Sequence, residues 1–154
     1  MNEKIQRFHL ALIGVSSIHK KYNMQKFNQL NLTTGQPKVL SILLKKEGYL
    51  QKDLAKRCHV EPATMTSILK NMESKSLIYK HQESVSGGKR AYSIYLTDEG
   101  REMASKVNEI VDASEEICFQ GFTEEEKQQL LTLLGRIQGN LEHQLSLEEE
   151  TIYE

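Results

Sequence analysis

The stretch that decides the fold is LQKDLAKRCHVEPATMTSILKNMESKSLI, residues 50–78. It predicts two helices joined by a tight turn, a short one over about 51–58 and a longer one from Pro62 to about Lys75. Their apolar residues have the spacing that a helix-turn-helix needs in its interior: Leu54, Ala55, Cys58, Val60, Met65 and Ile68. His59 stands where a glycine often makes a left-handed turn, and histidine tolerates that conformation better than most residues.

The longer helix offers a polar face opposite its apolar one. The apolar face follows the i, i+3, i+4, i+7 pattern with Met65, Ile68, Leu69 and Met72. The other face has short polar or basic side chains and no carboxylate: Ala63, Thr66, Ser67, Lys70 and Ser74, flanked by Thr64 and Asn71. Small hydroxyl and amide groups fit a DNA groove, from which carboxylates would be repelled. An ordinary solvated helix face is the alternative interpretation.

Two strand-like runs follow this helix, LIYKHQ at 77–82 and YSIYL at 92–96. The segment between them carries turn-forming residues: Ser84, Ser86, Gly87 and Gly88. A hairpin directly after a helix-turn-helix predicts a winged helix, and its tip ends in the basic pair Lys89 and Arg90. Because Gly87 and Gly88 precede a strand and not a helix, they are not a phosphate-binding loop.

Amphipathic helices are also expected on both sides of this unit. Residues 3–29 carry one stripe at three- and four-residue steps: Ile5, Phe8, Leu12, Val15, His19 and Tyr22. A second helix should start at Thr33, which has capping-box spacing from Gln36, and stop at Gly48. After the wing, Thr97 should cap a further helix.

The C-terminal part carries two more apolar stripes, one along residues 98–119 and one after a break at Gly121 and a capping box of Thr123 and Glu126. Their members are Met103, Val107, Ile110, Val111 and Ile117 in the first, and Leu130, Leu134, Ile137, Leu141 and Leu145 in the second. A single stripe is more often core than interface. Three striped helices have more apolar surface than a small domain can cover, which predicts that they pack against a second copy of the chain.

Composition limits the class of protein. A chain of 154 residues with 38% hydrophobic content can bury one core. Its net charge of −1 conceals +5 over 1–44, +5 over 45–97 and −11 over 98–154. Such asymmetry is typical of a chain that meets a polyanion with one part only, although a solvated basic face is about as common. No apolar run approaches the roughly 20 residues of a membrane span, and two cysteines are too few for a disulfide framework. We therefore expect a cytoplasmic protein without membrane contact.

Catalytic and metal chemistry receive little support. Cys58 lies on the inward side of its short helix, where the side chain of the adjacent His59 diverges from it, so a core thiol is expected instead of a nucleophile. The same interpretation, a packed small residue, is preferred for Cys118. The histidines show no HxxxH or HExxH spacing and no CxxC exists, so we expect no metal and no cofactor.

Four stretches in this order resemble the multiple-antibiotic-resistance (MarR) regulators over nearly the whole chain: LTTGQPKVLSIL, LQKDLAKRCHVEPATMTSILKNMESKSLI, GKRAYSIYLTDEG and FTEEEKQQLLTLLGRI. The resemblance implies a mainly α fold, a winged helix-turn-helix with a small antiparallel β wing and a helical dimerisation region. It also implies a homodimeric regulator, not an enzyme, that binds a pseudo-palindromic operator in double-stranded DNA and is often released by a small-molecule effector or an oxidant. A winged-helix module that contacts protein and not DNA is the alternative.

The resemblance also implies an organisation: an N-terminal dimerisation helix at 1–30, the winged helix-turn-helix at 31–97, C-terminal dimerisation helices at 98–147 and a tail at 148–154. It assigns the recognition helix to the major groove through Pro62, Ala63, Thr64, Thr66, Ser67, Lys70 and Asn71. The family's wing usually carries an acid and two basic residues, and here those places hold Gly88, Lys89 and Arg90. The basic pair suits a minor groove, where the potential is most negative.

Overall fold

The computed structural model describes residues 7–152. Its elements are, in order, α1 (Phe8–Gln29), α2 (Gln36–Lys45), β1 (Tyr49–Leu50), α3 (Gln51–Arg57), α4 (Pro62–Ser74), β2 (Ile78–Ser84), β3 (Arg90–Leu96), α5 (Asp98–Cys118) and α6 (Glu124–Ile152). The chain divides into two compact units, Met1–Ser114 and Glu115–Glu154, so that the boundary falls inside α5. No helix among the described residues combines the length and the apolar content that crossing a membrane requires.

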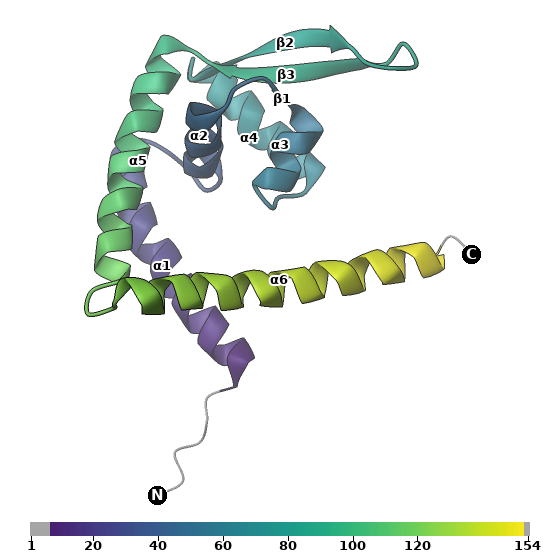
Figure 1. Cartoon of the computed structure of the whole chain (residues 1–154). Coiled ribbons are helices and arrows are strands. Elements are labelled where there is room, and N and C mark those ends of the chain that lie inside the picture. The colour runs from purple at the N-terminus through teal and green to yellow at the C-terminus, as the bar shows by residue number, and fades with distance from the viewer. Residues whose placement is uncertain (1–6, 153–154) are drawn as a thin grey trace, which may run out of the picture. The chain divides into compact units, whose positions relative to one another are not determined.

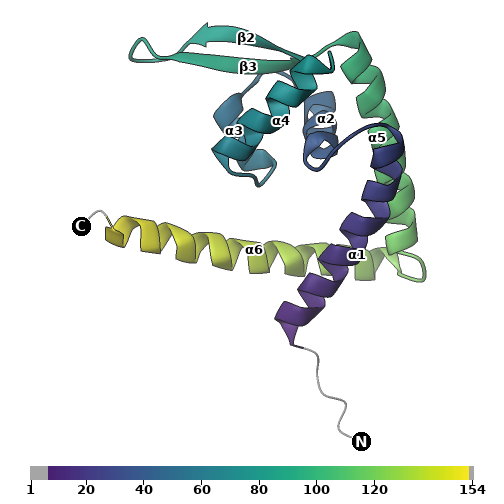
Figure 2. The ribbon, with the colours of Figure 1, turned by 180° about the vertical axis from the view of Figure 1, so that it is seen from behind.

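The helix-turn-helix is confirmed. The side chains of Leu54, Met65 and Leu69 are fully buried in a core that α2, α3, α4 and the sheet share. The turn between α3 and α4 places His59 at φ +52°, the left-handed conformation expected there. It is closed by a hydrogen bond of 3.1 Å from the amide of Val60 to the carbonyl of Ala55. The view from behind shows α4 crossing α3 below the wing (Figure 2).

The wing is confirmed as an antiparallel hairpin whose register runs from Ile78 opposite Leu96 to Ser84 opposite Arg90. The hairpin extends beyond the helices that it follows (Figure 1). A third strand, β1, pairs with β3 on the other side, giving the order β1-β3-β2. This strand was not predicted, because two residues are too short to show an alternating pattern.

The expected start of the second helix at Thr33 is wrong. Thr33 lies in a turn before the helix, where its carbonyl accepts a hydrogen bond from the amide of Gln36. Gly35, at φ +92°, precedes the first residue of α2. Half of the predicted capping box forms, because the amide of Thr33 donates to Gln36 Oε1 at 3.0 Å. The helix also ends before Gly48, whose amide donates instead to the carbonyl of Ile94 in β3 at 2.9 Å.

The first helix forms, but it is not amphipathic. Within α1 only Asn23 and Phe27 are buried. Phe8, Leu12 and Val15 of the predicted stripe are exposed, and Ile5 lies outside the described residues. Further exposed apolar residues lie off the stripe: Leu10, Ile13 and Ile18. Apolar side chains therefore surround this helix, and the folded chain covers few of them.

The predicted caps of the last two helices are confirmed. Thr97 Oγ1 accepts the amide of Gly100 at 2.9 Å in the first turn of α5. Thr123 and Glu126 form both bonds of a capping box, at 2.8 Å and 3.1 Å. α6 continues to Ile152, so most of the expected tail at 148–154 is helical.

Candidate nucleic-acid interface

The exposed side of α4 carries all of its predicted contact residues. Helical periodicity turns Met65, Leu69 and Met72 into the core, where each is fully buried. The opposite side leaves seven residues exposed to solvent: Pro62, Ala63, Thr64, Thr66, Ser67, Lys70 and Asn71. Glu73 is also exposed, two turns beyond Thr66 on one flank, so the carboxylate-free part of the face is its centre and N-terminal half.

The hydroxyl groups of this face are already oriented by the helix. Thr66 Oγ1 donates to the carbonyl of Pro62 at 3.1 Å, and Ser67 Oγ donates to that of Ala63 at 3.4 Å. Thr66 Oγ1 also accepts a bond of 2.9 Å from Gln51 Nε2. A hydroxyl has one proton and two lone pairs, so the oxygens of Thr66 and Ser67 can each still accept a hydrogen bond from a ligand. Gln51 was missed at the sequence level, although the first helix of a helix-turn-helix begins close to the second.

Asn71 is exposed, but its side-chain oxygen forms a hydrogen bond within the protein. Gln36 Nε2, from the first residue of α2, donates to Asn71 Oδ1 at 2.6 Å. The amide oxygen has two lone pairs and the amide nitrogen two hydrogens, so Nδ2 of Asn71 and one lone pair of Oδ1 remain for a nucleic acid. Lys75 joins the same group through bonds of 2.6 Å to the carbonyl of Asn31 and 3.3 Å to Gln36 Oε1.

The wing tip presents two exposed cations. Lys89 lies in the tip loop, and Arg90 opens β3. Alternate residues of a strand point to the same face, so Arg90 shares its face with the exposed Tyr92. Gly87 at φ +85° and Gly88 at φ +71° are both left-handed. Glycine at 88 therefore has a conformational reason, since another residue there would be strained.

A carboxylate braces the wing from a different position. Ser93 Oγ, fully buried on β3, lies 2.8 Å from Glu83 Oε1 and 3.2 Å from the carbonyl of His81, both on β2. Cross-strand contacts of this kind stabilise a two-stranded ribbon. The hairpin thus has an internal polar link although its tip carries Gly88 in place of an acid.

The two cysteines differ in environment. Cys58 is buried, as predicted, and burial raises the pKa of its thiol, an effect that the charge of Lys38 only partly opposes. Lys38 Nζ also donates to the carbonyl of Cys58 at 2.8 Å. Cys118 is exposed in the single chain, so the prediction that it is packed is wrong. Among the described residues, no cluster of three or more His, Cys, Asp or Glu side chains could hold a metal ion.

Comparisons with known proteins find similar sequences and similar folds. Residues 32–86 match the sequence model of the MarR family. The uncharacterized HTH-type transcriptional regulator YybA of Bacillus subtilis (strain 168) is 28% identical over 132 residues, which are 86% of this chain and 82% of that protein. The S. aureus MepR–DNA complex is similar with a TM-score of 0.78 and 26% identity, over 88% of this chain and 98% of that chain. A MarR protein from Peptoclostridium difficile has a TM-score of 0.77 and 26% identity over 94% of both chains.

Proposed function

Because the chain belongs to the MarR family, we propose that it binds double-stranded DNA as a homodimer and regulates transcription from a pseudo-palindromic operator. The observation that carries this proposal is the pairing of two exposed elements, the polar centre of the α4 face and a wing tip with Lys89 and Arg90. A groove-reading helix beside a cationic wing is what a winged helix needs for duplex DNA. MepR of S. aureus, which shares the fold, has been solved with DNA.

The seven exposed residues of α4 enter the major groove in this proposal. Ala63 and Ser67 lie at the centre of the face and are small enough for close approach of the helix to base edges. Lys70, on the same side one turn beyond Ser67, contacts phosphate. Asn71 acts through Nδ2 and through the lone pair of Oδ1 that Gln36 does not use.

The two cations of the wing, Lys89 and Arg90, have different roles in this proposal. Lys89 lies in the tip loop and Arg90 in the first position of β3, and in this proposal one enters the adjacent minor groove while the other contacts the phosphate backbone. The two single variants distinguish these roles, since a lost phosphate contact weakens binding to all sequences about equally and a lost groove contact weakens the preferred sites most.

Dimerisation is proposed through the helices outside the winged unit, at 1–30 and 98–147. The single chain leaves a long set of large apolar side chains exposed there: Phe8, Leu10, Leu12, Ile13, Val15, Ile18, Val111, Ile117, Leu130, Leu131, Leu133, Leu134, Leu141, Leu145 and Leu147. None of the α6 side chains from Glu124 to Glu150 is buried. Exposed apolar surface of this extent is unusual for a monomer and typical of an interface. Release by a small-molecule effector completes the proposal and rests on the family resemblance alone.

Selection of bound sites from random duplex DNA tests the DNA-binding part. We expect enrichment of an inverted repeat whose half-sites lie roughly 10 base pairs apart. Lys70→Ala, Lys89→Ala and Arg90→Ala should each weaken binding, and each lost phosphate contact should reduce the salt slope by about one unit. Lys106→Ala on α5 is the matched control and should leave both unchanged. Absence of an enriched site, or binding independent of salt, would instead favour a protein-interaction module.

Sedimentation of stripe variants tests the dimer. Leu141→Glu places a charge within the α6 stripe and should shift the protein toward monomer. Thr132→Glu adds the same charge on the opposite side of α6, about 180° away by helical periodicity, and should not. If the wild-type protein sediments as a monomer at micromolar concentration, the proposed dimer is wrong. The DNA-binding proposal is tested separately by the site selection.

A further inference from the structure

A pocket of about 900 Å³ lies between the end of α2, β1 and α3. Its volume is in the range of small-molecule sites. Four of its lining residues carry a positive charge: Lys45, Lys46, Lys56 and Arg57. Of the described residues that line the pocket, Asp53 alone has a carboxylate. The lining therefore has a net charge of about +3 in a chain whose total is −1.

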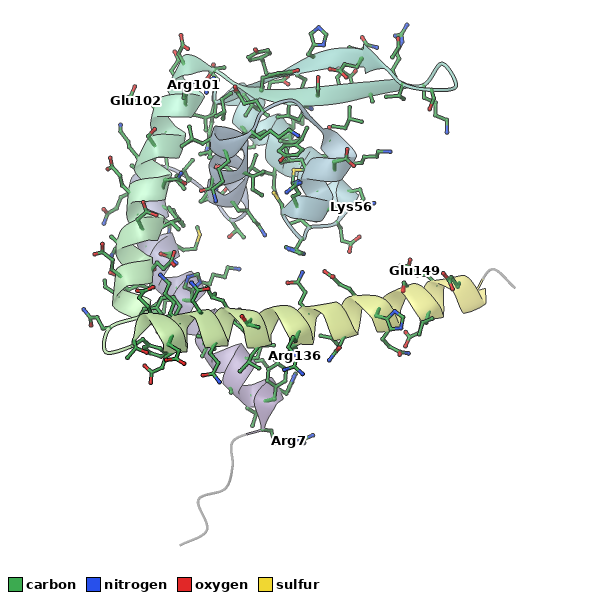
Figure 3. The ribbon with its side chains drawn as sticks, viewed as in Figure 1. Arg7, Lys56, Arg101, Glu102, Arg136 and Glu149 are labelled. Atoms are coloured by element: carbon green, nitrogen blue, oxygen red, sulfur yellow. The ribbon has the colours of Figure 1, made fainter. Side chains whose placement is uncertain are left out.

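Among the described residues, none of these four cations forms an ion pair with a carboxylate. Among residues 7–152, the ion pairs of Lys and Arg with carboxylates involve other residues: Arg101 with Glu47, Lys106 with Glu102 and Lys127 with Glu115. Glu47 directly follows Lys46, but its carboxylate binds the amide of Leu96 and the guanidinium of Arg101, which extends from the start of α5 (Figure 3). Glu47, the acid nearest to Lys46 in the sequence, thus bonds to other groups, and Asp53 balances only one of the four positive charges. A bound anion would relieve the remaining mutual repulsion.

Tyr49 holds two of the cations near one another. Arg57 Cζ lies 4.9 Å and Lys46 Nζ 5.3 Å from the centroid of its ring. Cation–π contacts restrain the long side chains of Lys46, which directly follows α2, and of Arg57 in α3. This restraint reduces the entropy lost when they close on a ligand. Ile42 and Leu50 add a partly buried apolar wall.

The pocket is separate from the α4 face. On α3, Leu54, Ala55 and Cys58 are buried toward the core, and Gln51 bonds to Thr66 of α4. Lys56 and Arg57 lie on the other side of α3 by helical periodicity, and both are exposed, with Lys56 projecting from α3 as drawn in Figure 3. A ligand in the pocket would therefore contact the first helix of the helix-turn-helix without covering the residues proposed to meet DNA.

We propose that this pocket binds a small organic anion with two or more negative charges, of the carboxylate or phosphate class. Arg57 supplies a planar fork that fits either oxyanion, and the lysines supply compact charges around it. The apolar wall of Ile42 and Leu50 takes the carbon skeleton. The inference concerns the free protein, and it stands whether or not the chain binds DNA.

Calorimetric titration of the full chain with citrate, pyrophosphate and acetate, at constant ionic strength, tests the proposal. Citrate or pyrophosphate should bind at least about tenfold more tightly than acetate, since one charge engages fewer of the cations, and the stronger of the two identifies the class. Arg57→Gln and Lys46→Gln should each weaken that binding about three- to tenfold. Lys106→Gln, which removes the same charge from α5, should not. In amide NMR spectra the signals of Gly48 and Leu50 should shift on titration.

Three results would overturn the proposal. The first is that multivalent anions bind no better than acetate. The second is that Lys106→Gln weakens binding as much as Arg57→Gln, which would indicate general attraction to a charged surface. The third is that an anion binds while the amide signals of Gly48 and Leu50 do not shift, which would place the binding site outside the pocket.

Discussion

Gln36 Nε2 donates a 2.6 Å hydrogen bond to Asn71 Oδ1 and so ties the start of α2 to the second half of the recognition helix. The Gln36 side chain is 1% exposed, and its Oε1 accepts from the amide of Thr33 at 3.0 Å and from Lys75 Nζ at 3.3 Å. Both ends of a buried amide are therefore satisfied, which is the condition for keeping a polar side chain in a core. The orientation of α4 depends on this group as well as on apolar packing.

Gln36→Leu should lower the free energy of unfolding by about 1–3 kcal/mol, because it leaves the Thr33 amide and Asn71 Oδ1 without these partners. Urea denaturation measures the change. Gln138→Leu is the matched control, since Gln138 bonds to Glu142 on the exposed surface of α6, and it should change stability by less than about 0.5 kcal/mol. Equal effects of the two substitutions would show that the buried amide has no special role.

Gly100→Ala should destabilise the protein by about 2–4 kcal/mol, because a Cβ at this position would overlap the carbonyl oxygen of Leu77. That carbonyl is held in place by the amide of Thr97, so it has little freedom to move. Gly135→Ala in α6 is the control, because nothing lies within 4 Å of its Cβ position, and it should stabilise the helix by up to about 1 kcal/mol. Thermal unfolding of the two variants should shift in opposite directions, and a harmless Gly100→Ala would contradict the close contact.

Glu47→Ala should cost more stability than Arg101→Ala. Glu47 Oε1 accepts the amide of Leu96 at 2.7 Å, and removing it leaves a buried backbone donor unpaired, at about 1–3 kcal/mol. Arg101 is half exposed, so losing its 3.1 Å ion pair should cost about 1 kcal/mol or less. Glu47→Gln, which keeps an acceptor oxygen, should recover most of the loss in Glu47→Ala. Urea unfolding of the three variants decides the order, and a larger loss in Arg101→Ala would reverse the assignment.

A thiol reagent should modify Cys118 quickly and Cys58 slowly in the native protein, because Cys118 is exposed while Cys58 is 2% exposed with a raised pKa. Cys118→Ser should abolish the fast reaction and Cys58→Ser should not. A raised pKa in the folded state means that Cys58 contributes stability fully below the thiol's ordinary value of 9.0 and loses it as pH rises through the folded value. The wild type should therefore lose stability at alkaline pH relative to Cys58→Ser, and equal alkaline profiles would contradict this.

The local periodicity of apolar residues in the sequence predicts much of the fold. The two helices of the helix-turn-helix, the wing hairpin and the capping box of Thr123 and Glu126 each depend on residues a few positions apart, so the pattern and its cause lie in the same short segment. The same holds for the exposed face of α4, because a helix of known register places Ala63, Ser67 and Lys70 together.

Contacts between distant segments were decided only by tertiary structure. The bond from Gln36 to Asn71 joins residues 35 positions apart, and the bond from the Leu96 amide to Glu47 joins residues 49 apart. The exposure of Cys118 depends likewise on packing beyond its own helix.

The sequence by itself thus determined the helix-turn-helix, the wing hairpin and the face that α4 turns outward, because hydrophobic spacing is a property of consecutive residues. Only the tertiary structure brought Lys46 and Arg57 to the same tyrosine ring, turned Glu47 away from them and fixed Asn71 to Gln36. The physical reason is that charge clusters and buried hydrogen bonds depend on which surfaces come into contact when helices and strands pack. A pattern of neighbouring residues does not contain that information.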